Sequence, residues 1–150
     1  MHRTTTIAVD LAKSVFQVAE ADAQWRVVGR HRLSRSQLLR YCGQRQPCLV
    51  VMEAWGTAHF WARCLRAVGF SVRLLPPQYV RPFVRRNKTD RSDADALLEA
   101  ARSAELAAVP VKSEHQQMVL SLHRLRSAWL ASRTARINTV RGILREFGIN

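Results

Sequence analysis

Residues 48–53 have the sequence Cys-Leu-Val-Val-Met-Glu, an apolar run that ends at a carboxylate. An unbroken apolar run of this kind, preceded by Pro47, is typical of a strand that is buried on both faces of a sheet. It is the longest apolar run in the chain and is far too short to cross a membrane. We therefore expect a central strand with helices on both faces, and no membrane partner.

Three short stretches before this strand are rich in strand-forming residues. Residues 5–11, 15–19 and 25–31 follow one another at the spacing of an antiparallel meander. After them, Ser34 is placed to cap a short helix that ends near Gly43. This part of the chain therefore predicts three antiparallel strands followed by one helix.

The segments after the central strand alternate between helix and strand. Residues 58–68 carry apolar side chains three and four positions apart, as in an amphipathic helix, and Gly69 stops the pattern. Residues 71–75 form another apolar strand, which two prolines halt. Because helical crossovers require parallel pairing, the order β-β-β-α-β-α-β predicts an α/β fold with a mixed sheet flanked by helices.

A helical part follows the sheet. Residues 93–102 are rich in Ala and Leu, Pro110 interrupts the chain, and one long helical pattern starts at Ser113. About 35 helical residues extend roughly 50 Å, which is longer than a compact domain needs, so this helix should pack on another helix. We expect a domain over residues 1–110, a long helical region that starts within residues 111–150, and a homo-oligomer formed through it. The helix has two apolar stripes: Met118, Leu122, Leu125 and Trp129, then Ile137, Val140, Leu144 and Phe147.

The chain is strongly basic, with a formal net charge of +13 and a pI near 11.4. Only three of its 24 basic residues are lysines, so 21 are arginines, whose planar guanidinium binds phosphate through two hydrogen bonds and stacks on bases. A GC-rich genome accounts for some of this bias, but the balance favours a nucleic-acid partner. The candidate nucleic-acid-binding residues are Lys13, Arg81, Arg85, Arg86, Lys88, Arg91, Arg124, Arg126, Arg133 and Arg136.

The N-terminal sequence has no long apolar stretch and no small-residue cleavage site, which argues against a secretory signal. The three cysteines, Cys42, Cys48 and Cys64, contain no CxxC motif, and their odd number argues against a disulfide framework. We therefore expect a cytoplasmic protein.

Four carboxylates stand where predicted elements end or begin. Asp10 closes the first strand and Glu53 closes the central strand. Asp90 and Asp93 lie three residues apart at a helix start, on one helix face, whereas Asp95 and Glu99 turn away from that face toward a solvated side. If the first and fourth strands are neighbours, Asp10 and Glu53 emerge side by side at the carboxyl edge of the sheet, where α/β folds bind ligands. The helix would then lay its two carboxylates across them.

Such a cluster calls for divalent cations. Two charges about 4 Å apart repel by about 4 kcal/mol at an effective dielectric of about 20. All-oxygen ligands select Mg²⁺ or Mn²⁺, and a pair of such ions about 4 Å apart activates the attacking oxygen and stabilises the leaving oxygen in phosphodiester cleavage. Structural roles stay open for each residue alone: a turn former at Asp10, an arginine pair at Glu53, a helix-dipole charge at Asp90 and an N-cap at Asp93.

Four motifs carry a family resemblance. They are Ile-Ala-Val-Asp-Leu-Ala-Lys at 7–13, Met-Glu-Ala-Trp-Gly at 52–56, Leu-Pro-Pro-Gln-Tyr-Val at 75–80 and Asn-Lys-Thr-Asp-Arg-Ser-Asp-Ala at 87–94. In this order they resemble the DEDD transposases of insertion-sequence family 110, which include the Piv-type DNA invertases. The resemblance covers essentially the whole chain and implies an RNase H-like, RuvC-like fold. It makes Asp10, Glu53, Asp90 and Asp93 the catalytic, metal-binding DEDD set, with Mg²⁺ or Mn²⁺ as cofactor.

The resemblance also implies a function. Members of this family are bacterial recombinases that cleave and transfer DNA strands when an insertion sequence moves, and some are guided by a structured RNA from that element. They carry a nucleophilic serine in a C-terminal domain, for which the serines of the helical stretch offer no counterpart. We therefore expect the N-terminal half of a transposase that acts on DNA, without its C-terminal serine domain.

Two alternatives share these residues. A structure-selective DNA nuclease of the RuvC junction-resolvase type would use the same carboxylates, whereas a non-catalytic nucleic-acid-binding or dimerisation module would use only the basic surface and the long helix. A sugar-kinase or actin-like ATPase shares the strand order, but residues 10–14 lack the glycine of its phosphate turn. Trp55, beside Glu53 and Gly56, either stacks on a base or packs in the core.

Overall fold

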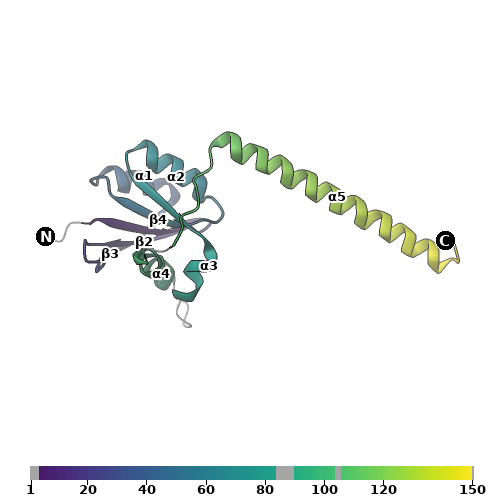
Figure 1. Ribbon diagram of the computed structural model, residues 1–150, viewed down its shortest axis with the longest axis horizontal. Helices are drawn as coiled ribbons and strands as arrows, with labels where there is room; N and C mark the ends of the chain where they lie inside the picture. Colours follow the sequence, from purple (N-terminus) through teal and green to yellow (C-terminus); the bar gives the residue numbers. More distant parts are fainter. Residues whose placement is uncertain (1–3, 84–89, 104–105, 150) are drawn as a thin grey trace. The chain divides into compact units, whose positions relative to one another are not determined.

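The computed structural model describes residues 4–83, 90–103 and 106–149, and for residues 90–92 it describes the backbone only. By its internal contacts the chain forms two compact units, Met1–Val111 and Lys112–Asn150. The first unit contains a five-stranded sheet with helices on both faces, and the second contains one long helix (Figure 1).

The sheet has the strand order β3-β2-β1-β4-β5. Short turns join the first three strands, which pair antiparallel, whereas helical crossovers precede β4 and β5, so that β1, β4 and β5 run parallel. The prediction of a mixed sheet is confirmed, and the first and fourth strands are neighbours, which is the condition under which Asp10 and Glu53 meet at one edge. The strands are β1 (Thr6–Asp10), β2 (Val15–Ala21), β3 (Val27–Ser34), β4 (Leu49–Glu53) and β5 (Ser71–Leu75).

The third strand begins two residues later than predicted because a turn occupies its expected start. The carboxylate of Asp22 accepts a hydrogen bond from the backbone N–H of Arg26 (3.0 Å), and Trp25 has a φ of 61°. These contacts hold the turn closed, and pairing with β2 starts only at Val27.

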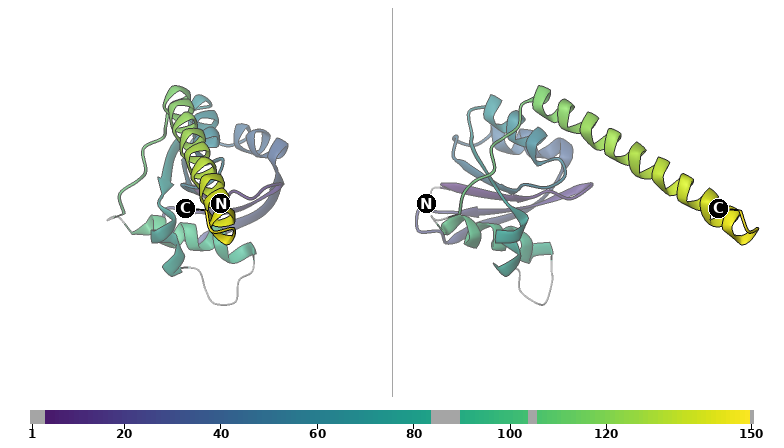
Figure 2. Two further views of the ribbon diagram at one scale, coloured as in Figure 1. Left: turned by 90° about the vertical axis from the view of Figure 1, so that its right-hand side faces the viewer. Right: turned by 45° about the vertical axis from the view of Figure 1, so that its right-hand side comes forward.

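Helices cover both faces of the sheet, with α1 and α2 on one side and α4 on the other (Figures 1 and 2). Ser34 is the N-cap of α1 as predicted, and its N–H donates to Oε1 of Gln37 (2.7 Å). The helix that was predicted from residue 93 starts one turn earlier. The helices of this unit are α1 (Arg35–Gly43), α2 (Ala58–Ala67), α3 (Pro77–Val80), the 3-10 helix η1 (Arg81–Phe83) and α4 (Asp90–Arg102).

The two faces of the sheet have different side chains. Because successive strand residues point to opposite faces, Ile7 and Val9 of β1 pack in a cluster with Trp61 of α2, whereas Ala8 packs in a second cluster with Leu97 of α4. The second cluster is rich in alanine on both the strands and the helix. Small side chains on both partners let α4 lie close to the strands.

The second unit is α5 (Glu114–Glu146), whose 33 residues extend about 50 Å. It begins where the sequence predicts: the Ser113 hydroxyl accepts from the N–H of Gln116 (3.1 Å), and the N–H of Ser113 donates to Oε1 of Gln116 (2.9 Å). None of the described residues of α5 is buried, so both apolar stripes are open to solvent. Among the helices that the structure describes, none combines the length and apolar character that crossing a bilayer requires.

Candidate metal centre and nucleic-acid interface

The two central parallel strands bring Asp10 and Glu53 to one edge of the sheet. Val9 lies opposite Met52 in the β1–β4 pair, so the next residue on each strand is at the same level, where both strands end. Asp10 is two residues beyond Ala8 and therefore shares its face, the one that α4 covers, and the same alternation puts Glu53 there. Both acidic residues are half-buried. The strand register therefore meets the condition under which the sequence places these two carboxylates side by side, and their role in a metal site stays a prediction.

Asp93 lies in the first turns of α4, the helix on this face. The residue is half-buried, and its Oδ1 is buried with no hydrogen-bond partner among the described residues. An unsatisfied buried acceptor costs about 1–3 kcal/mol, and more when it is charged, so this oxygen is well suited to a cation. Because the helix begins at Asp90, Asp93 lies inside it and is not the N-cap, the structural role that the sequence left open.

The complete four-carboxylate site stays a prediction. The side chain of Asp90 lies outside the described residues, and within the described part of the chain no group of three or more His, Cys, Asp and Glu side chains is arranged to hold a metal ion. The structure brings Asp10 and Glu53 to a shared edge and sets the helix of Asp93 over the same face. Carboxylate oxygens, one of them without a partner, are donors that fit a hard divalent cation.

Contacts near both ends fasten α4 to the sheet. In its second turn, Asp95, which is partly exposed, binds the Arg30 guanidinium of β3 through two contacts of 3.2 and 2.9 Å, an ion pair that the sequence did not indicate. At the other end, Arg73 of β5 donates to the carbonyl of Ala101 (3.2 Å) and to that of Leu106 (2.6 Å). These contacts join residues 28 to 65 positions apart and fix the helix that carries Asp93.

The predicted nucleic-acid-binding residues are only partly described. Lys13, in the turn after β1, and Arg81, at the start of η1, are exposed, and both follow the carboxyl ends of parallel strands. Arg85, Arg86 and Lys88 lie outside the described residues, as does the side chain of Arg91. The four arginines Arg124, Arg126, Arg133 and Arg136 are exposed on α5. Their binding of nucleic acid stays a prediction.

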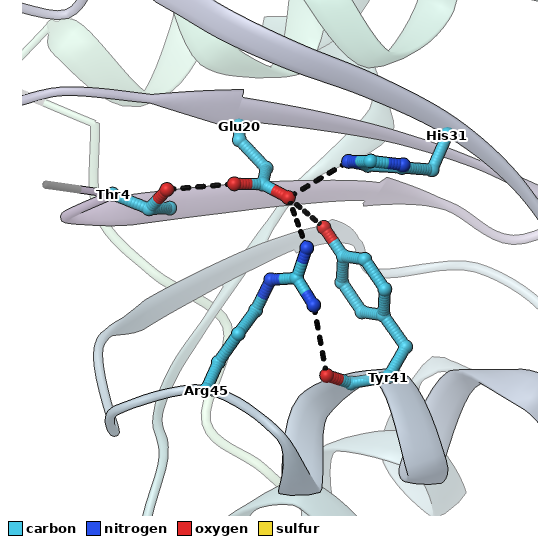
Figure 3. A network of polar contacts seen from close by, with 5 residues as sticks. All are labelled: Thr4, Glu20, His31, Tyr41 and Arg45. Atoms are coloured by element: carbon cyan, nitrogen blue, oxygen red, sulfur yellow. Dashed lines mark hydrogen bonds and ion pairs between the residues drawn. The ribbon is translucent and has the colours of Figure 1, made fainter. Parts of the chain in front are cut away.

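Glu20, which no sequence motif marks, is only 7% exposed and lies at the centre of a polar network (Figure 3). Its carboxylate accepts hydrogen bonds from the Thr4 hydroxyl (2.6 Å), the Arg45 guanidinium (2.7 Å) and the Tyr41 hydroxyl, and lies 2.9 Å from Nε2 of His31. The Arg45 guanidinium also stacks 3.5 Å from the centre of the Tyr41 ring. These partners come from four different places in the sequence and converge on one carboxylate.

This network stabilises the fold at the edge of the sheet opposite to the edge where Asp10 lies. Glu20 lies across from Ile7, near the start of β1, whereas Asp10 ends that strand. Burial by itself raises the pKa of Glu20, but the hydrogen bonds from Thr4, Tyr41 and Arg45 outweigh it and lower the pKa from 4.5 to about 2. The network therefore fastens α1 and the chain after it to β2.

A protein-family model for the DEDD transposases of insertion-sequence family 110, described as transposase, matches residues 7–149. The chain belongs to this transposase family. Its relatives include a probable family 20 transposase of Pseudomonas aeruginosa, 51% identical over 143 residues, and the transposase for insertion sequence element IS1111A of Coxiella burnetii, 40% identical over 143 residues. A third is the transposase for insertion sequence element IS1328 of Yersinia enterocolitica, 38% identical over 150 residues.

These three alignments cover 95%, 95% and 100% of this transposase-family chain but 42%, 39% and 45% of the relatives. The chain therefore spans about two fifths of their length. A solved structure, T. thermophilus RuvC in complex with a Holliday junction substrate, matches 71% of this chain and all of its own, with a TM-score of 0.50 and 10% identity. This likeness confirms the predicted RuvC-like, RNase H-like fold.

Proposed function

We propose that this chain is the DNA-cleaving domain of an insertion-sequence transposase, and that it cuts phosphodiester bonds at the carboxyl edge of β1 and β4. The observation that carries the proposal is the parallel register that sets Asp10 beside Glu53 on the face covered by α4. Membership of the transposase family supports this type of reaction, and a net charge of +13 suits a DNA substrate.

In this proposal Asp10, Glu53, Asp90 and Asp93 hold Mg²⁺ or Mn²⁺. The oxygen-only donor set and the unpartnered Oδ1 of Asp93 support it. When bound, the ions supply activation of the attacking oxygen and charge stabilisation at the leaving oxygen. The carboxylates orient the ions, and the exposed Lys13 and the other basic residues after the parallel strands bind the phosphates of the DNA strand.

The domain division, the oligomeric state, the partners and the cellular compartment are also part of what we propose. Residues 1–110 form the catalytic domain, and residues 111–150 begin a helical region whose exposed apolar stripes pair copies of the chain as a homo-oligomer. Strand transfer requires a serine from a further C-terminal domain, and the protein acts on DNA in the bacterial cytoplasm. A structured guide RNA is a second candidate partner for the basic surface.

Recombination by the full-length transposase in cells tests the function. We expect Asp10→Asn, Glu53→Gln and Asp93→Asn each to abolish it, because each removes a metal ligand. The melting temperature of each purified variant, measured in EDTA, should not fall below that of wild type. Glu99→Gln is the matched control, since Glu99 is an exposed carboxylate on α4.

Near-normal recombination by any of the three variants would contradict the proposed site. Metal-dependent cleavage of four-way junctions without recombination would instead support the structure-selective nuclease. If no DNA is cleaved under any condition and binding is unaffected by the three variants, the chain is a nucleic-acid-binding module.

A further inference from the structure

Trp55 is exposed beside the candidate metal centre. It follows Glu53 by two residues, and its side chain is 72% exposed, whereas Trp61 in the core is 4% exposed. Consecutive residues span at most about 3.6 Å, so the Cα atoms of Trp55 and Glu53 are within about 7 Å of each other. Exposing a large indole forfeits the stabilisation that its burial would give. The structure thus rules out core packing for this residue.

A hydrogen-bonded turn holds Trp55 in place. Its N–H donates to the carbonyl of Glu53 (2.8 Å), and its own carbonyl accepts from the N–H of Ala58 at the start of α2 (3.0 Å). The N–H of Ala54 donates to the carbonyl of Leu75 at the end of β5 (2.7 Å). Both peptide groups that flank the Trp55 side chain are therefore tied to the rigid sheet and helix.

The surroundings of the indole suit a flat ligand. The other residues of the turn, Ala54, Gly56 and Thr57, are small, and a Cβ built on Gly56 would meet no atom within 4 Å. A protein interface needs a contiguous apolar patch, which these neighbours do not extend, whereas a nucleobase needs only one accessible aromatic face. The net charge of +13 and the exposed Lys13, which follows β1 at the same edge, favour a nucleic acid.

We propose that Trp55 is a stacking platform for an unpaired base of the DNA strand that is bound at the edge formed by Asp10 and Glu53. This inference rests on the proposed function, because it takes the bound strand to be DNA at that edge. Stacking next to the cleaved phosphate positions the strand and favours DNA whose bases are unpaired there. Trp55 is a positioning residue, and every aromatic side chain at this place supplies the same contact in part.

A fluorescent base analogue tests the inference directly. A forked oligodeoxynucleotide with 2-aminopurine in its single-stranded arm is titrated with the protein in EDTA, so that only binding is measured. We expect Trp55→Ala to weaken binding about five- to 150-fold and to abolish the quenching of 2-aminopurine at saturation. Trp55→Phe should retain most of the affinity and most of the quenching of 2-aminopurine. Leu39→Ala, which truncates an apolar side chain that is 40% exposed on α1, is the control and should leave the quenching amplitude unchanged.

Full quenching by Trp55→Ala, or an equal loss of affinity for a fully paired duplex, would overturn the inference. The test does not depend on catalysis, because EDTA removes divalent metal. A wild-type protein that quenches 2-aminopurine but never cleaves DNA in Mg²⁺ would refute the proposed function and leave the stacking role intact.

Discussion

Replacing Glu20 by Gln should clearly reduce the loss of stability that the sheet domain shows as the pH falls through the acidic range. In the unfolded chain the carboxyl has its ordinary pKa of 4.5, whereas in the folded protein hydrogen bonds lower the pKa to about 2 against the opposing effect of burial. A tenfold change in the acid dissociation constant of a group corresponds to about 1.4 kcal/mol of free energy. The charged network therefore contributes roughly 3 kcal/mol to the free energy of unfolding at neutral pH.

The direction of the pH dependence follows from the lowered pKa. The contribution is complete above about pH 5, where the carboxylate is charged in both states. It declines as the pH falls from about 4.5 to about 2, because the unfolded chain takes up a proton first. Relative to wild type, the free energy of unfolding of Glu20→Gln should be lower by about 3 kcal/mol at pH 7 and almost the same near pH 2.

Urea unfolding at a series of pH values measures this difference. The measurement uses a background in which Trp25, Trp55 and Trp129 are replaced by Phe, so that the emission comes from Trp61 alone. Trp61 is 4% exposed in the core between the sheet and α2, and its emission therefore reports the sheet domain. Glu99→Gln, which removes an exposed carboxylate on α4, should keep the wild-type pH profile. If wild type and Glu20→Gln lose stability in parallel between pH 5 and pH 2.5, the reasoning about the network is refuted.

Three further predictions concern α4 and the basic surface. Arg73→Ala removes the hydrogen bonds to the carbonyls of Ala101 and Leu106, so it should cost about 1–3 kcal/mol and speed hydrogen exchange of the α4 amides; unchanged exchange would mean that these bonds do not hold the helix. Ala8→Leu adds volume where the sheet contacts α4, so chemical denaturation should show a loss of about 1–3 kcal/mol, and a stable variant with an unshifted helix would contradict the close packing. DNA affinity should fall steeply between about 50 and 200 mM salt in filter binding, and a flat profile would remove the case for phosphate contacts.

The main features of the sheet follow from local sequence patterns. The apolar run at residues 48–53 predicts a doubly covered strand, and crossover helices allow only parallel pairing with its neighbours. The sequence also shows that Asp10 and Glu53 each end a strand, but that these two strands are neighbours is known only from the register. These features of the sheet could be predicted because they depend on the periodicity and polarity of the sequence and on the lengths of the connections between strands.

Contacts between distant residues could not be predicted in this way. The burial of Glu20 depends on partners from Thr4 to Arg45 that meet only in the folded chain, and the strand pattern gives no sign of it beyond one charge on a buried face. Arg30, 65 positions before Asp95, binds its carboxylate, and no local pattern in the helix indicates this contact. The exposure of Trp55 likewise depends on a turn whose hydrogen bonds involve both β5 and α2.

Metal-induced stabilisation of the 150-residue chain tests the central claim most directly. With Mn²⁺ at about ten times its dissociation constant, and ionic strength matched with NaCl, the melting temperature of wild type should rise by roughly 5 °C, because bound ions relieve carboxylate repulsion. Glu99→Gln should behave like wild type, and Asp93→Asn should show no rise. A wild-type melting temperature that does not respond to millimolar Mn²⁺ or Mg²⁺, or an equal rise in Asp93→Asn, would contradict a metal centre at the edge of β1 and β4.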